Sequence, residues 1–178
     1  LILSAIILIV FLRYEKSKKP PVYDLGLLKN FQYVLGNYSA FVMYFMTFIA
    51  SYILNFYLQN ALGYDSRFAG LFLLATPIAV VLVSSFAGKL SDKRDERTIS
   101  SIALTFILVD VVILFFMDCL PLNVLLIACV LQGIGHGLFS SPNNRFVLTI
   151  VDKKDLADAS AMLSTSKDVG KSISLSLF

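Results

Sequence analysis

Long apolar runs separated by short charged connections dominate the chain. Four runs carry few charges and are each long enough to cross a bilayer as a helix, at about residues 38–59, 68–87, 98–117 and 124–150. A fifth run, 159–178, extends to the end of the sequence, and residues 1–12 resemble the last turns of a preceding membrane helix. The pattern predicts an all-α, polytopic membrane helix bundle.

Basic residues fall in alternate connections. Lys and Arg gather at 13–37, 88–97 and 151–158, whereas the connections between them carry almost none. Because basic loops stay on the cytoplasmic side, we expect these three to face the cytoplasm in a multi-pass protein of the plasma membrane. Residues 13–37 are then a cytoplasmic linker and 38–178 a transmembrane bundle. We expect the chain to be part of a longer protein.

Composition narrows the class further. Of the 178 residues, 57% are apolar and 15% charged, against about 25% charged in soluble domains. The net charge of +3 comes largely from loops, which suggests an anionic lipid surface rather than a nucleic-acid partner. We find no credible catalytic set, metal-ligand cluster or nucleotide motif, so we expect no enzyme, no catalytic residues, no metal and no cofactor.

Polar residues recur on one face of two predicted helices. The first stripe is Tyr44, Thr47, Ser51, Asn55 and Gln59, and the second is Gln132, His136, Ser140 and Asn143. The candidates for lining a water-filled substrate cavity are Tyr44, Ser51, Tyr52, Asn55, Gln59, Gln132, His136 and Asn143. Alternatively, Ser and Thr bond their own backbone and small residues such as Gly133 and Gly137 pack helices closely. His136 suits either proton relay or a hydrogen-bonded packing role.

The last helix carries the costliest side chains for a membrane. Lys167, Asp168 and Lys171 would each cost roughly 2.5–3.5 kcal/mol at the bilayer centre. They indicate coupling or helix pairing, although Lys167 could instead snorkel to the cytoplasmic surface. Asp110 stands among Val and Leu, so it is either paired with a neighbouring helix or near the outer surface.

The sequence GKLSDK at 88–93 resembles the cytoplasmic signature loop of the major facilitator superfamily. Segment 20–30 (PPVYDLGLLKN) resembles the linker before the second six-helix half in the fourteen-helix drug:proton antiporter branch, and 132–139 (QGIGHGLF) resembles its tenth core helix. The resemblance implies the second half of such a transporter, truncated at both ends. It also implies a cytoplasmic gating motif formed by Gly88, Asp92, Lys93, Arg94 and Arg97.

The function implied by this resemblance is secondary active transport by alternating access. The leading hypothesis is proton-coupled efflux of amphipathic or cationic small molecules, with aromatic side chains suited to such substrates. Its partners would be the substrate, protons, the lipid bilayer and the N-terminal half of the same polypeptide. Alternatives are a sugar or metabolite proton symporter of the same fold and a non-transporting membrane scaffold or sensor.

Overall fold

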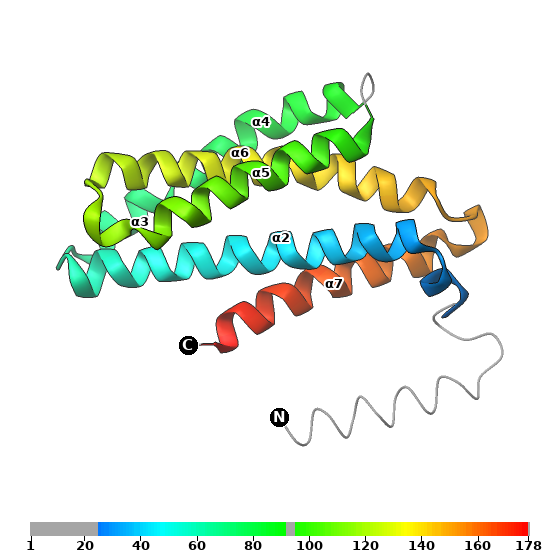
Figure 1. Cartoon of the computed structure of the whole chain (residues 1–178), viewed down its shortest axis with the longest axis horizontal. Coiled ribbons are helices and arrows are strands. Elements are labelled where there is room, and N and C mark those ends of the chain that lie inside the picture. The colour runs from blue at the N-terminus through cyan, green and yellow to red at the C-terminus, as the bar shows by residue number, and fades with distance from the viewer. Residues whose placement is uncertain (1–24, 92–94, 178) are drawn as a thin grey trace.

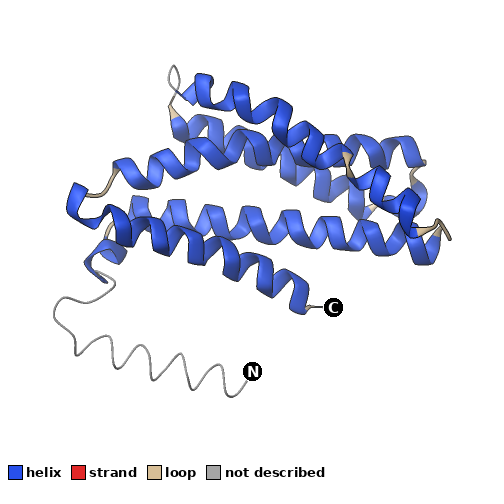
Figure 2. Ribbon diagram, turned by 180° about the vertical axis from the view of Figure 1, so that it is seen from behind, coloured by secondary structure: helices blue, strands red, loops and turns tan. Residues whose placement is uncertain are grey.

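The computed structural model describes residues 25–91 and 95–177, and the described chain is helical throughout with short connections and no strand (Figure 2). Residues 1–12, the first part of the expected linker (13–24), Asp92, Lys93, Arg94 and Phe178 lie outside the described residues. The expected all-α fold is confirmed for the described part.

Five long helical segments with short turns between them build the fold. In order they are η1 (Leu25–Lys29), α2 (Phe31–Phe56) with the π turn η2 (Tyr57–Ala61), α3 (Ser66–Leu73), α4 (Ala75–Ser91), α5 (Glu96–Phe115), η3 (Met117–Cys119), α6 (Leu122–Thr149), η4 (Lys153–Asp155) and α7 (Leu156–Ser176). Helix α6 packs against both α4 and α5, and α2 packs along α7 (Figure 1). Contacts of α2 with α5 and α6 join the two groups.

Four of the described helical segments are long and apolar enough to cross a membrane: Phe31–Ala61, Ser66–Leu90, Glu96–Phe115 and Leu122–Thr149. Their outward faces are strongly apolar, with Phe86 71% and Phe115 81% exposed. Apolar surface of this extent is unfavourable in water and matches lipid tails. The expected polytopic membrane fold is therefore confirmed. Helix α7, which carries four charged residues, is not among the four.

Helix α2 begins seven residues earlier than expected, so the interpretation of 31–37 as linker is wrong. The Asn30 side chain caps the helix by accepting hydrogen bonds from the backbone N–H groups of Gln32 and Tyr33, at 3.0 and 3.4 Å. Tyr33 is buried in the core, and Asn37 donates to its carbonyl at 2.9 Å. Polar residues in this first stretch lower its hydropathy, so a search for long apolar runs does not detect the start of the helix.

The second span is interrupted nearer its N-terminal end. The predicted helix at 68–87 is two helices, α3 and α4, which meet at a turn on Leu74. Pro77 has no N–H to donate to the Leu73 carbonyl, which weakens the helix where the turn occurs. Helix α4 then runs on to Ser91, so the first residues of the expected loop 88–97 are helical, and α5 begins at Glu96.

The third of the basic connections, 151–158, is also shorter than expected. Helix α7 begins at Leu156, within the predicted loop 151–158, directly after the 3-10 turn η4. Two acidic residues lie at its start: Asp155 at the N-cap position and Asp158 in the first turn. Negative charge is favourable at this end of the helix dipole and helps the helix start there.

Glycines set the spacing of α6 against its neighbours. A Cβ on Gly133 would collide with the Thr76 carbonyl of α4, and one on Gly137 would lie 3.1 Å from the Val80 carbonyl. Gly135 faces the other way, and a Cβ there would lie 2.9 Å from the Ala103 carbonyl of α5. The expected close-packing role of Gly133 and Gly137 is confirmed, because side chains there would force α4 and α6 apart.

Candidate functional site

An aromatic and basic cluster lies where α2, α6 and α7 meet. Tyr44 of α2 and His136 of α6, each near the middle of its helix, pack edge to face with ring centroids 5.0 Å apart. The amines of Lys167 and Lys171 on α7 lie 5.6 and 5.1 Å from the Tyr44 ring centroid. Phe48 lies one turn further along α2, with its ring centroid 5.7 Å from the Lys171 amine. We call these five residues the Tyr44 cluster.

The two lysines have different polar partners. Lys167 is partly buried and donates to the amide oxygen of Asn144 on α6 at 2.7 Å. Lys171 pairs with Asp168 at 3.0 Å, as the i,i+3 spacing predicts. Because its amine is held between α6 and the Tyr44 ring, Lys167 is engaged inside the bundle, and this geometry does not favour the snorkelling alternative.

Gln132 occupies a different kind of site. Its side chain is 3% exposed. The amide nitrogen donates to the Thr47 carbonyl at 3.1 Å, while the amide oxygen accepts from the hydroxyls of Ser51 and Thr76, both at 3.2 Å. Gln132 therefore ties α2, α4 and α6 together inside this bundle, and its amide groups are occupied by these hydrogen bonds.

Asn143 makes a similar tie nearer the C-terminal end of α6. It is buried and donates to the Gly36 carbonyl of α2 at 3.2 Å. Close by, the Ser166 hydroxyl of α7 donates to the Asn37 amide oxygen at 3.3 Å. Sequence reasoning missed Asn37 and Asn144, because Asn37 lay in the expected linker and Asn144 lies just off the α6 stripe.

The remaining cavity candidates lie toward the η2 end of α2. The Gln59 amide donates to Asn55 at 2.8 Å, and its oxygen accepts from Ser66 at 2.9 Å. Tyr52 is 38% exposed on the same helix. The structure thus separates the predicted set into three groups: the Tyr44 cluster, the buried ties at Gln132 and Asn143, and this partly exposed group.

Of the gating motif, Gly88 and Arg97 belong to the described residues. Gly88 lies in the last turns of α4, and the Arg97 guanidinium stacks over the Phe146 ring at 5.1 Å. Next to it, Arg145 of α6 pairs with Glu96 at 3.3 Å. This ion pair, which the motif did not predict, joins the start of α5 to the last turns of α6.

Asp110 is buried within α5. It is 1% exposed, and its Oδ2 has no hydrogen-bond partner among the described residues. Its burial directs the side chain toward neighbouring helices, and the alternative of a depth near the outer surface of the membrane stays a prediction. No group of His, Cys, Asp and Glu suited to a metal ion occurs in the described chain.

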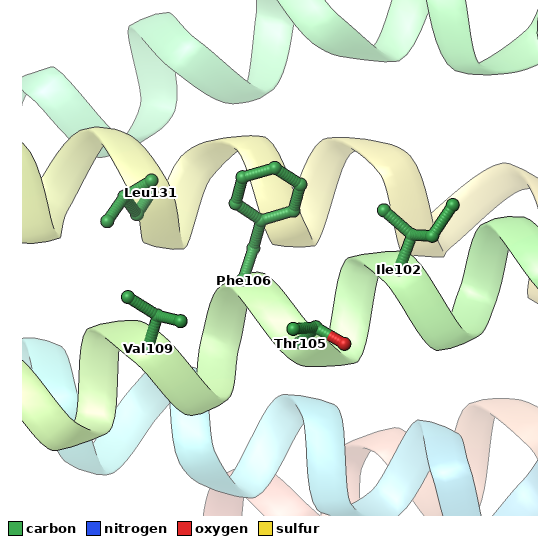
Figure 3. Close-up of a pocket in the computed structure, with 5 residues that line it drawn as sticks. All are labelled: Ile102, Thr105, Phe106, Val109 and Leu131. Carbon is green, nitrogen blue, oxygen red and sulfur yellow. The ribbon is translucent and has the colours of Figure 1, made fainter.

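One pocket opens beside α5 and α6 and is lined by Ile102, Thr105, Phe106, Val109 and Leu131 (Figure 3). None of these residues is a predicted cavity residue. The Thr105 hydroxyl donates to the Ser101 carbonyl of its own helix, so the pocket offers little polar recognition.

A membrane bundle that gathers charged and aromatic side chains at the middle of its helices has the make-up of a transport protein. Comparison with known families agrees, because the model of the Major Facilitator Superfamily matches residues 1–175. The chain belongs to this family.

Over the aligned regions, named relatives are identical to the chain at about a quarter of the positions. The riboflavin transporter RibZ of Clostridioides difficile is 28% identical over 99% of the chain and 39% of its own length. The lincomycin resistance protein LmrB of Listeria monocytogenes is 28% identical over 97% of the chain and 37% of its length. The probable multidrug resistance protein EmrY of Escherichia coli is 24% identical over 99% and 35%. The chain therefore spans well under half of these relatives.

Proposed function

We propose that the chain is part of a secondary active transporter that exports amphipathic small molecules by proton-coupled alternating access. The observation that carries this proposal is the Tyr44 cluster, where groups from α2, α6 and α7 converge at mid-height of an apolar bundle. Intramembrane charges are costly, so their convergence marks a pathway. The names of LmrB, a lincomycin resistance protein, and EmrY, a probable multidrug resistance protein, favour foreign compounds as substrates.

In the proposed mechanism this chain supplies one wall of the transport pathway. Its relatives are much longer, and an N-terminal half of the same polypeptide would supply the facing wall. Rocking of one half against the other would expose the cluster to each side of the plasma membrane in turn. Loops 13–37, 88–97 and 151–158 would face the cytoplasm.

The charged residues where α4 and α6 end and α5 begins would control the change between the two conformations. Asp92, Lys93 and Arg94 would form ion pairs in one conformation that break in the other. Arg97 and the neighbouring Glu96–Arg145 pair, which already joins α5 to α6, would provide a fixed base for them. His136 and the Lys171–Asp168 pair are candidates for coupling proton movement to substrate movement.

The test uses inverted membrane vesicles that contain the full-length polypeptide. With an acidic interior, we expect gradient-dependent loading of aromatic fluorescent dyes, which a protonophore abolishes. Asp92→Asn should abolish loading while the protein remains in the membrane. Asp152→Asn, which removes an exposed acid from another loop, should leave loading unchanged. Absence of loading by the wild-type protein across charged and neutral dyes would contradict the proposal.

A metabolite symporter is the second candidate, favoured by the similarity to a riboflavin transporter. In intact cells, substrate-dependent alkalinisation of the medium would support uptake with protons and contradict export. If neither flux is found, a scaffold or sensor role would replace transport.

A further inference from the structure

The Tyr44 cluster carries more positive than negative charge. Lys167 and Lys171 both approach the Tyr44 ring, yet the one carboxylate in contact with them among the described residues is Asp168. That carboxylate is turned outward, with 69% of its side chain exposed, and it touches Lys171 alone. The hydrogen bond of Lys167 goes to a neutral amide oxygen. The cluster therefore carries about one uncompensated positive charge at a membrane depth where such charge is costly.

The surroundings of this charge are aromatic on one side and open on the other. The Tyr44 ring faces both amines and the Phe48 ring faces that of Lys171, and cation–π contact stabilises an ammonium without neutralising it. A third of the Lys171 side chain stays exposed. An incoming group can thus reach the amine while its apolar part lies against the rings.

We propose, on the basis of the transport function above, that the Tyr44 cluster binds the anionic group of an aromatic substrate, such as a carboxylate, sulfonate or phosphate. An anion placed between Lys167 and Lys171 would receive charge-assisted hydrogen bonds and neutralise the excess charge. A cationic substrate would be repelled by both amines. The substrate class is therefore anionic, whereas the sequence suggested amphipathic or cationic small molecules.

A carboxylate elsewhere in the same polypeptide could supply the same neutralising chemistry. The two sources of negative charge, a protein carboxylate and the substrate, predict different affinities for a soluble anionic ligand. If the protein itself neutralises the lysines, an added anion gains nothing from them. If the substrate does so, the affinity for an anionic ligand depends on both lysines.

The test compares two xanthene dyes of similar shape and opposite charge, fluorescein and tetramethylrhodamine methyl ester. Their binding to the full-length polypeptide in nanodiscs is followed by fluorescence anisotropy. We expect the wild-type protein to bind fluorescein at least about tenfold more tightly. Lys167→Gln or Lys171→Gln should each raise the Kd for fluorescein by about tenfold, the size expected for loss of a charge-assisted hydrogen bond.

Matched variants guard against a purely structural effect. Lys167→Arg and Lys171→Arg keep the charge and should keep fluorescein binding. Lys153→Gln removes an exposed lysine from η4 and should change nothing. Asp168→Asn removes the competing carboxylate from an exposed position and should lower the Kd, which keeps the test informative if a lysine variant misfolds.

Three results would overturn the inference: tighter binding of the rhodamine, an unchanged Kd for fluorescein in both glutamine variants, or no binding of either dye. Preference for the rhodamine together with gradient-driven loading of vesicles would leave the transport proposal standing and remove the anionic class alone. Absence of loading in the vesicle experiment would remove the transport proposal itself.

Discussion

Gln132 shows how one polar side chain can hold three membrane helices. Its hydrogen bonds reach Thr47, Ser51 and Thr76, and buried amide groups are costly when left unpaired. We predict that Gln132→Leu lowers the free energy of unfolding by about 2 kcal/mol, since hydrogen bonds between membrane helices contribute about 0.6 kcal/mol each and the stranded partners add to the loss. The thermal unfolding midpoint of the full-length protein, followed by circular dichroism, measures this.

The control for that substitution is Gln32→Leu, near the start of α2, where the side chain is exposed. It should shift the unfolding free energy by no more than about 0.5 kcal/mol. If Gln132→Leu were equally harmless while dye loading was lost, Gln132 would face the substrate and the structural role would be wrong.

Replacement of Asp110 should raise the free energy of unfolding, whereas replacement of Gln132 lowers it. Its carboxyl is buried with an unpartnered oxygen, and replacing such a group with an apolar one of similar volume removes a desolvation cost. We predict that Asp110→Leu raises the free energy of unfolding by about 1–3 kcal/mol. A loss of stability in the same thermal assay would mean that the carboxyl has a partner outside the described residues.

At this scale the sequence located the polar residues but could not assign their surroundings. A stripe that faces water and a stripe that ties two helices together have the same helical period, so Gln132 and Tyr44 looked equivalent. Their difference depends on which neighbouring helix lies opposite, and that is a long-range property. Asn144 had a weaker signal, because it lies one position beyond Asn143 and off the stripe.

Among the elements, α6 is positioned by its glycines. We predict that Gly133→Ala lowers the free energy of unfolding by about 1–3 kcal/mol, because the added Cβ would overlap the Thr76 carbonyl and lie 2.5 Å from the Ala79 Cβ. A backbone carbonyl cannot rotate away as a side chain can, so α4 and α6 must separate. Thermal unfolding of the full-length protein measures the loss.

Gly70 of α3 provides the matched control. No atom lies within 4 Å of a Cβ built there, so Gly70→Ala should stabilise the helix by about 0.5–1 kcal/mol through reduced backbone entropy. Equal effects of the two substitutions would mean that α4 and α6 do not pack closely in the membrane.

Helix number was predictable from the sequence, and helix ends were less so. Apolar runs found each membrane span because a bilayer demands about twenty apolar residues in a row. The start of α2 depended instead on the Asn30 cap and the buried Tyr33, which a hydropathy pattern does not weigh. Pro77 was visible in the middle of the predicted helix 68–87, but proline is tolerated within membrane helices, so the turn at Leu74 was not expected.

For the molecule as a whole, the position of the Tyr44 cluster limits what this chain can do by itself. The cluster draws on α2, α6 and α7, and its exposed groups have no facing wall among the described residues. Because the chain spans 39% or less of the relatives named above, we predict that proteoliposomes of residues 1–178 alone show no saturable dye flux. Co-reconstitution with the rest of the polypeptide should restore it, since alternating access needs two bodies that move against each other. Saturable flux from residues 1–178 alone would contradict the two-wall mechanism and place the whole pathway within these helices.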